Sequence, residues 1–232
     1  MLIDGLQKLT LLDYPGKVAA TIFTFGCNFR CGFCHNPELV LLEKQRPNPE
    51  LAEEKILEFL RSRQGFLEGV VITGGEPTLQ PDLEDFIFKA KALGFLVKLD
   101  TNGAVSAVLS RLLARHLLDF VAMDIKNSPG KYAETAGRQV NLSEIKKSVE
   151  MIKSSGVDYE FRSTLLTGLH SPEDILEMAR FIGNAKKYVL QRFVSRPELV
   201  DKSFVRYRAF SDILLKDLAK KCEEWVERCE IR

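Results

Sequence analysis

The chain has 232 residues, 45% of them hydrophobic and 28% charged, which is the composition of an ordinary globular protein with one sizeable core. Its formal net charge is +1, from 33 basic and 32 acidic residues, so the charge balance indicates neither a nucleic-acid nor an anionic-membrane partner. No apolar run reaches the length of a membrane-spanning helix and residues 1–4 do not begin a signal peptide, so we expect a cytoplasmic protein.

Strand and helix patterns alternate along most of the chain. Residues 2–14 form a mixed lead-in, which we expect to hold short strands or an edge hairpin. Residues 18–25 are β-branched and aromatic, and predict a buried strand. Further predicted strands cover 69–73, 95–99, 119–123, 159–166 and 188–193, and predicted helices lie between them, with start signals at 48–50 and 171–174 and a long C-terminal helix at about 209–228.

The recurring strand–helix unit favours a parallel sheet with helices outside. Six such units predict an α/β fold with a partial, open (β/α)6 barrel, and a doubly wound sheet is the alternative. No composition break or low-complexity linker interrupts the chain. We therefore expect a single domain over residues 1–232, made of a lead-in (1–16), a barrel core (17–194) and a C-terminal segment with its helix (195–232).

Three of the five cysteines lie in one window directly after the first buried strand, at Cys27, Cys31 and Cys34. Disulfides are rare in the cytoplasm, and thiolates bind zinc, copper(I) and iron–sulfur centres. The window therefore predicts a soft-metal or iron–sulfur site. A four-iron cluster commonly takes four cysteines, so three would leave one iron open to a ligand from outside the protein.

Glycines and charged residues follow the next three predicted strands: Gly74-Gly75-Glu76-Pro77, then Asp100-Thr101-Asn102-Gly103, then Asp124-Ile125-Lys126. In a parallel barrel these strand ends face the same rim as the cysteines. The glycines would let the main chain approach a ligand closely. The aspartates could hold hydroxyls or a cation, and the lysine could pair with a carboxylate. This rim is the candidate site.

The Cys-x3-Cys-x2-Cys spacing, the aromatic residue Phe33 before the last cysteine, and the sequence at 74–77 resemble the radical S-adenosylmethionine superfamily. The sequences at 13–17, 26–28, 34–37 and 100–103 resemble those of the glycyl-radical-enzyme activases. Within these, the chain is most similar to the anaerobic ribonucleoside-triphosphate reductase activating proteins. The resemblance covers nearly the whole chain and is weakest after about residue 160.

The resemblance implies that Cys27, Cys31 and Cys34 hold a [4Fe-4S] cluster whose fourth iron is chelated by the amino and carboxylate groups of S-adenosylmethionine. One electron then yields methionine and a 5′-deoxyadenosyl radical, which takes a hydrogen atom from a glycine of a partner enzyme, here an anaerobic ribonucleotide reductase. The electron would come from a donor such as flavodoxin or ferredoxin. Some members also hold a monovalent cation near the positions of Asp100 and Asp124.

The resemblance also implies which residues lie against the cofactor, and they come from successive strand ends. Related activases carry a histidine near the end of the last barrel strand, where this chain has Leu190-Gln191-Arg192-Phe193. Gln191 or Arg192 could take that position, and Gln191 is our choice. The expected contacts are Phe33, Cys34, His35, Gly74, Gly75, Glu76, Asp100, Thr101, Asn102, Asp124, Lys126 and Gln191.

Two other functions stay open at this point. A radical enzyme of the same superfamily could act on a small molecule, in modified-nucleoside or cofactor synthesis. Alternatively, the cysteine window could be a structural zinc site with His35 as the fourth ligand, in a binding module without catalysis.

Other polar and sulfur-containing residues have two interpretations each. Arg162, inside an apolar strand, is either an inward ion-pair partner or a substrate-end residue. Cys222 and Cys229 follow helical spacing, which favours packing over a second metal site. Residues 2–16 and 195–208 are candidates for a partner-binding or lid role.

Overall fold

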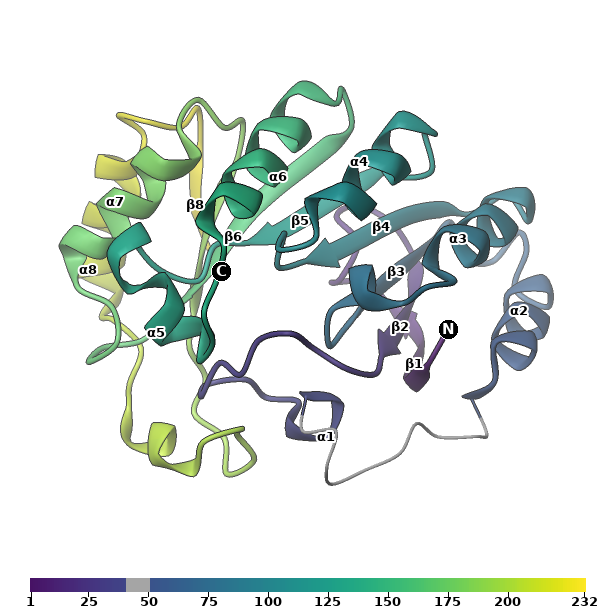
Figure 1. The fold of residues 1–232 in the computed structure, drawn as a ribbon, viewed down its shortest axis with the longest axis horizontal. Coiled ribbons are helices and arrows are strands. Elements are labelled where there is room, and N and C mark those ends of the chain that lie inside the picture. Colours follow the sequence, from purple (N-terminus) through teal and green to yellow (C-terminus); the bar gives the residue numbers. More distant parts are fainter. Residues whose placement is uncertain (41–50) are drawn as a thin grey trace. The chain divides into compact units, whose positions relative to one another are not determined.

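The computed structural model describes residues 1–40 and 51–232 (Figure 1). These residues divide into two compact units. The N-terminal unit consists of the described residues of Met1–Asn28, Glu38–Thr101 and Ala107–Val121. The C-terminal unit consists of Phe29–Pro37, Asn102–Ser106 and Ala122–Arg232. The boundary runs through the cysteine window, because Cys27 belongs to the first unit and the other two cysteines to the second.

The N-terminal unit contains one antiparallel and two parallel strand pairs. β1 (Ile3–Thr10) pairs antiparallel with β2 (Ala19–Thr24), as an edge hairpin in the lead-in would. β2 pairs in parallel with β3 (Gly69–Gly74), and β3 pairs in parallel with β4 (Leu96–Thr101). The parallel strands β2, β3 and β4 are mostly buried, as expected for strands covered on both faces, whereas the edge strand β1 is largely accessible.

Helices follow the strands of this unit and bury apolar side chains against them. The clearest is α3 (Leu83–Ala92), whose Leu83, Phe86 and Ile87 are fully buried on one face. The other described helical elements that begin or lie in this part of the chain are α1 (Pro37–Val40), α2 (Glu53–Arg61), the 3₁₀ turn η2 (Pro77–Leu79) and α4 (Ser106–Ala114).

The C-terminal unit repeats the strand–helix alternation. β6 (Asp158–Leu165) pairs in parallel with β7 (Tyr188–Arg192), and β7 pairs in parallel with β8 (Cys229–Ile231). The α7 helix (Pro172–Ile182) begins with the expected capping box, in which Ser171 and Asp174 bond each other's backbone. The remaining elements are the 3₁₀ turns η3 (Pro129–Lys131) and η4 (Lys202–Arg206) and the helices α5 (Tyr132–Ala136), α6 (Leu142–Ser154) and α8 (Asp212–Cys222).

The strand order follows the chain from β1 to β8, with β5 (Phe120–Asp124) contributing residues to both units. A doubly wound sheet would reverse its strand order at a switch point, and this order does not. The order begins and ends on different strands, so the sheet is open rather than closed. The predicted α/β fold with an open parallel sheet is confirmed.

The predicted C-terminal helix at 209–228 is wrong in its second half. The helix is α8 (Asp212–Cys222), and the chain then turns into β8 (Cys229–Ile231). The backbone N–H of Glu227 donates to the Ala185 carbonyl at 2.9 Å, and β8 pairs with β7. Hydrogen bonds to residues distant in sequence therefore stabilise a strand here, although the local pattern predicts a helix. Cys222 packs on the helix as predicted, but Cys229 lies on a strand.

Two sequence-based predictions, a helix start and the lack of a membrane-spanning segment, remain to be compared with the structure. The predicted helix start at 48–50 lies outside the described residues. Within the described part of the chain, no helix combines the length and the apolar character needed to cross a membrane.

Candidate active site

In the N-terminal unit, the ends of β2 and β3 touch through their backbones just before the cysteine window. The N–H of Gly75 donates to the Thr24 carbonyl at 2.8 Å, and the N–H of Glu76 donates to the Gly26 carbonyl at 2.7 Å. A Cβ on Gly75 would overlap the Gly26 carbonyl, and Gly74 has a φ of 107°. These glycines are therefore required by the contact between the strand ends, whatever else they approach.

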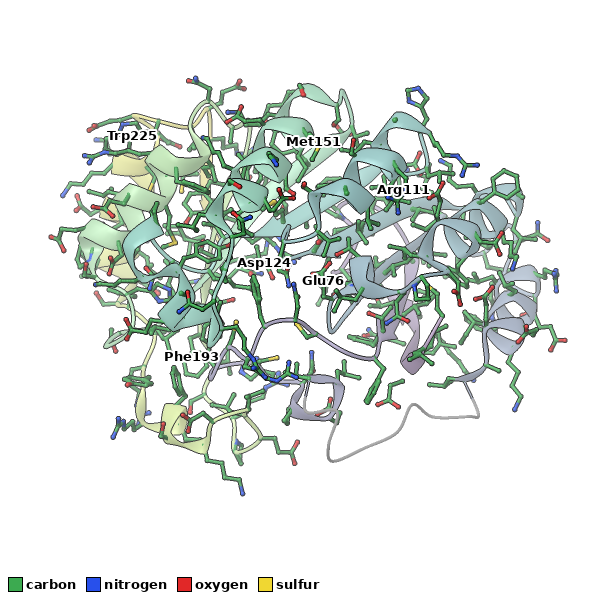
Figure 2. All side chains as sticks on the ribbon, in the orientation of Figure 1. Glu76, Arg111, Asp124, Met151, Phe193 and Trp225 are labelled. Atoms are coloured by element: carbon green, nitrogen blue, oxygen red, sulfur yellow. The ribbon has the colours of Figure 1, made fainter. Side chains whose placement is uncertain are left out.

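Glu76 is buried on the turn after β3, where Figure 2 labels it, and its carboxylate accepts hydrogen bonds from Thr78 and Thr101. Its Oε1 accepts from the backbone N–H of Thr78 at 3.1 Å and from the hydroxyl of the same residue. It also accepts from the Thr101 hydroxyl at 2.7 Å. The structure thus brings together two residues of the predicted site, Glu76 and Thr101. It adds Thr78, which the sequence analysis missed.

Asp100 forms an ion pair with Lys98 inside the N-terminal unit. The two residues are two positions apart on β4, so their side chains leave the strand on the same face. The Lys98 side chain is only 2% exposed, and its ammonium lies 5.9 Å from the centre of the Phe120 ring. Sequence reasoning missed Lys98, although Lys-x-Asp in an apolar strand is a readable signal of such a pair.

In the C-terminal unit, the loop that carries Cys31 and Cys34 is held by its own backbone and by a distant segment. The N–H of Cys34 donates to the Cys31 carbonyl at 3.0 Å. The Cys34 carbonyl accepts from Val200 at 3.1 Å, and Asp201 donates to the Gly32 carbonyl at 3.0 Å. Part of the 195–208 segment, a candidate for a lid or partner role, therefore fixes the shape of the cysteine loop.

All five cysteines are thiols, and none is in a disulfide. Burial raises the pKa of the Cys31 thiol to about 11, while the Lys126 ammonium acts in the opposite direction. In the N-terminal unit, the Cys27 sulfur lies 3.9 Å from Oδ1 of Asn28. Metal binding at Cys31 would displace its proton, and a nearby lysine favours the thiolate that results.

Phe33 is buried, and His35 is engaged by the end of the last parallel strand of the predicted barrel. The His35 ring stacks on Phe193, with ring centres 5.8 Å apart and an interplanar angle of 7°. Its Nε2 lies 2.7 Å from the Val194 carbonyl oxygen. A carbonyl oxygen only accepts, so Nε2 carries the proton and is not available as a zinc ligand.

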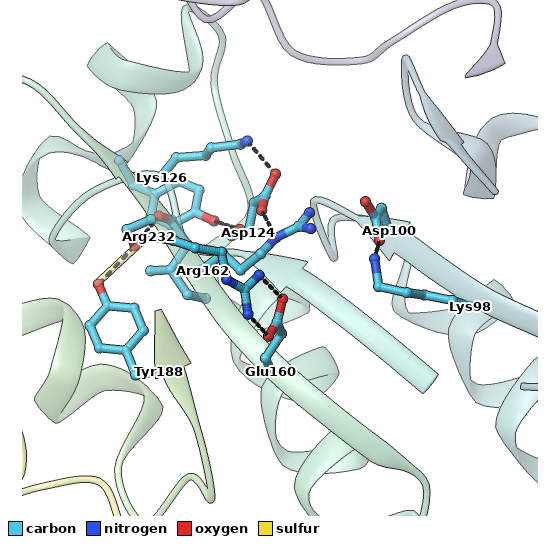
Figure 3. Close-up of polar contacts among 11 residues, drawn as sticks. Lys98, Asp100, Asp124, Lys126, Glu160, Arg162, Tyr188 and Arg232 are labelled. Atoms are coloured by element: carbon cyan, nitrogen blue, oxygen red, sulfur yellow. Dashed lines mark hydrogen bonds and ion pairs between the residues drawn. The ribbon is translucent and has the colours of Figure 1, made fainter. Parts of the chain in front are cut away.

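Asp124, at the end of β5, is paired with two cations in the C-terminal unit (Figure 3). The Lys126 ammonium bonds one carboxylate oxygen at 3.0 Å, and Nε of Arg162 bonds the other at 2.9 Å. Burial opposes ionisation of Asp124, but Arg162 and Lys126 outweigh it and lower its pKa. Of the two interpretations of Arg162, the ion pair is confirmed.

His170 is a buried residue that positions Lys126, and the sequence analysis missed it. Its Nε2 donates to the Lys126 carbonyl at 2.9 Å, and its Nδ1 accepts from the Leu166 backbone N–H at 3.4 Å. This pairing defines a neutral ring, and burial lowers the pKa of His170 accordingly. The partners are 44 and 4 residues away. No local pattern predicts the longer contact.

The other two predicted contacts are Asn102 and Gln191. Oδ1 of Asn102 accepts from the Ala104 N–H at 2.9 Å and closes the turn after β4. Gln191 is half-buried on β7, where it lies opposite Thr164 of β6. Within residues 1–40 and 51–232, no group of three or more His, Cys, Asp and Glu side chains is arranged to hold a single metal ion.

Similar proteins agree on the family. Residues 21–182 match the model of the Radical SAM superfamily. A provisionally named glycyl-radical enzyme activating enzyme of Methanocaldococcus jannaschii is 34% identical over 236 residues, which cover 100% of this chain and 95% of that protein. A pyruvate formate-lyase-activating enzyme of Clostridium pasteurianum is 30% identical over 192 residues, covering 79% of this chain and 77% of that one.

Two further proteins show how widely the fold is used. A GTP 3′,8-cyclase of Aquifex aeolicus is 31% identical over 223 residues, covering 94% of this chain and 65% of that enzyme. The solved structure of TYW1 with a lysine-pyruvate adduct has a TM-score of 0.62 at 19% identity, and covers 89% of this chain and 73% of that one, so it supports the fold alone. The match over residues 21–182 and the end-to-end relative together place this chain, as an enzyme, in the radical SAM superfamily, whose members use a [4Fe-4S] cluster and S-adenosylmethionine.

Proposed function

We propose that this enzyme activates a glycyl radical enzyme, specifically an anaerobic ribonucleoside-triphosphate reductase, in the cytoplasm. The observation that carries the proposal is the end-to-end relation to a glycyl-radical enzyme activating enzyme, at 34% identity over the whole chain. The reductase as partner is supported by the motifs at 13–17, 34–37 and 100–103. In this proposal the whole chain acts as one radical SAM domain.

The proposed cluster ligands are Cys27, Cys31 and Cys34. The donor set fits, because all three are thiols outside disulfides and thiolates are the ordinary ligands of iron–sulfur clusters. When bound, the reduced cluster with S-adenosylmethionine supplies the 5′-deoxyadenosyl radical that removes a hydrogen atom from glycine. Cys31 would lose its proton on binding the cluster, and Lys126 would stabilise the thiolate, since its charge already lowers the thiol pKa.

The proposed cofactor contacts are held in place before any cofactor binds. Thr78 and Thr101 fix the Glu76 carboxylate through the bonds described above. Arg162 and His170 fix Asp124 and the Lys126 backbone. Such prior positioning reduces the cost of orienting a bound cofactor and helps to exclude water from it. The remaining proposed contacts are Phe33, Cys34, His35, Gly74, Gly75, Asp100, Asn102 and Gln191.

The test is anaerobic reconstitution with iron and sulfide, dithionite reduction, and incubation with S-adenosylmethionine and the candidate reductase. We expect 5′-deoxyadenosine together with a glycyl-radical EPR signal on the reductase. Cys27→Ser, Cys31→Ser and Cys34→Ser should each lose the cluster and the product. Cys229→Ser removes the same kind of thiol from β8, and should keep the iron content of the parent protein.

Three results would contradict different parts of the proposal. Colourless protein with one zinc and no iron would establish the binding module instead. Iron without any 5′-deoxyadenosine would reject the assigned site. 5′-Deoxyadenosine without a radical on the reductase would reject the partner, and a flavodoxin or ferredoxin in place of dithionite tests the natural class of electron donor.

A small-molecule substrate is the second candidate, and the GTP 3′,8-cyclase relative favours it. The two candidates differ in what accelerates cofactor cleavage. We expect the reductase to increase the rate of 5′-deoxyadenosine formation, and nucleotides alone to leave it unchanged. Acceleration by a nucleotide without protein would reverse the order of the two candidates.

A further inference from the structure

Both aspartates at the predicted cation positions already have cationic side chains as partners within their own units (Figure 3). The family resemblance implies that some members hold a monovalent cation near these positions. A sodium or potassium ion at a carboxylate competes with cationic side chains for the same oxygen atoms, and nearby positive charge repels it. Whether such an ion fits this chain therefore depends on which cationic side chains already bond Asp100 and Asp124.

Asp100 is neutralised by a lysine that has been brought into the protein interior. The Lys98 side chain is 2% exposed and Asp100 is 14% exposed. Withdrawing an ammonium from water is unfavourable unless a carboxylate pairs with it. Asp100 supplies that carboxylate, from the same face of the same strand. The pair is thus built into β4, and its positive member occupies the place of a counter-ion to Asp100.

Asp124 has one cation on each carboxylate oxygen. Lys126 is 3.0 Å from Oδ2 and Nε of Arg162 is 2.9 Å from Oδ1. The side chains of Lys126 and Arg162 are 18% and 13% exposed, so water screens them little. Both oxygens of this carboxylate therefore face a cation, and a further cation there would be repelled.

We propose that cationic side chains take the place of a monovalent cation at each aspartate, Lys98 at Asp100 and Arg162 at Asp124, so that this enzyme binds and cleaves S-adenosylmethionine without sodium or potassium. The donor set does not fit the ion, because each carboxylate already bonds a cationic side chain through an oxygen that the ion would need. The inference rests on the proposed cofactor site, but it needs no particular partner enzyme. The substitutions that test it are Lys98→Met and Arg162→Met, which keep much of the apolar side chain and remove its charge.

The first measurement is 5′-deoxyadenosine formation by the reconstituted enzyme in tetramethylammonium, sodium or potassium chloride at equal ionic strength. We expect the three rates of the unsubstituted enzyme to agree within about twofold. Lys98→Met and Arg162→Met should lose about tenfold or more in tetramethylammonium, and recover most of it in sodium or potassium. Lys91→Met removes the cation of another ion pair in the N-terminal unit, to Asp119 at 2.7 Å, and should show no salt preference.

The second measurement does not depend on turnover. Sodium that binds to the protein broadens the ²³Na NMR line, and added potassium reverses the broadening by displacing the sodium. We expect no such reversible broadening with the reconstituted parent enzyme, and we expect it with both variants. A rate that rises about tenfold with sodium or potassium in the unsubstituted enzyme would overturn the proposal, as would displaceable broadening. Variants that neither bind sodium nor regain activity would overturn it too. If no salt supports cleavage, the proposed function fails and the sodium line still decides this inference.

Discussion

The two units hold their candidate-site carboxylates by different means. In the N-terminal unit, Glu76 is fully buried and accepts from two hydroxyls and a backbone N–H. In the C-terminal unit, Asp124 is partly buried and bonds an ammonium and a guanidinium. Neutral donors orient a carboxylate while contributing little electrostatic free energy. The free energy of a buried ion pair depends strongly on the protonation state of the carboxylate and on the presence of each partner. The contrast predicts different responses to substitution and to pH.

The largest effect should come from the backbone contact that supports Glu76. Gly75→Ala would place a methyl group against the Gly26 carbonyl, which cannot move without separating β2 from β3. We expect a loss of about 3 kcal/mol or more in the free energy of unfolding, measured with urea.

Gly130→Ala is the matched control, because a Cβ there meets no atom within 4 Å. Its stability should change by less than about 1 kcal/mol, in either direction. If Gly75→Ala unfolds at the same urea concentration as Gly130→Ala, the contact between the strand ends does not hold the N-terminal half of the site.

The next effect concerns the C-terminal half and uses Cys31 as a probe. Because burial raises the pKa of this thiol to about 11, at pH 8 its thiolate fraction should be about a hundredfold below that of an exposed cysteine. Alkylation of the iron-free, reduced protein by iodoacetamide, followed by mass spectrometry, should show Cys31 reacting correspondingly slowly. Lys126→Met should slow it further, since the ammonium lowers the thiol pKa.

Concentrated urea provides the control for that measurement, because unfolding exposes the same thiol in the same chain. Equal alkylation rates at Cys31 with and without urea would contradict the burial of this sulfur. They would also remove the reason for assigning Lys126 a role in stabilising its thiolate.

The ion pairs of Asp124 should make stability depend on pH. The pKa of Asp124 is lowered in the folded protein, so its contribution is present above the pKa of the unfolded chain, about 4, and is lost as the pH falls through the folded pKa. Asp124→Asn should lower the free energy of unfolding by about 2 kcal/mol at pH 7, and by progressively less below pH 4.

The exposed pair of Arg192 and Asp212 offers a comparison, with Nε and Oδ1 2.9 Å apart and side chains 37% and 69% exposed. Asp212→Asn should cost less than about 1 kcal/mol. Urea titrations from pH 7 to pH 2 separate the two. A constant difference between Asp124→Asn and the parent protein across that range would show that the carboxylate charge contributes nothing.

The contrast between the units also explains what could be predicted from sequence. The strand bounds and the glycine turns follow from local patterns, such as the apolar run that became β2 (Ala19–Thr24). The pairing of Lys98 with Asp100 was readable from their spacing on one strand. The hydrogen bond between His170 and the Lys126 carbonyl could not be read from the sequence, because it joins residues 44 positions apart. β8 (Cys229–Ile231) was missed for the same reason, since its hydrogen bonds come from β7 and not from its own sequence.

The smallest effect should come from removing one of the neutral groups that donate hydrogen bonds to Glu76. Thr101→Val preserves the shape of the side chain and removes the hydroxyl that donates to Glu76 at 2.7 Å. The carboxylate keeps the backbone N–H and the hydroxyl of Thr78, so the expected loss is about 1 kcal/mol in the free energy of unfolding. Thr78→Val should cost a similar amount, and the double variant should cost more than the sum of the two, because the buried carboxylate then loses both of these hydroxyls. Urea unfolding of the three variants measures this coupling. Strict additivity would mean that the two threonines do not act on the same carboxylate, and the neutral anchoring of Glu76 would then lose its support.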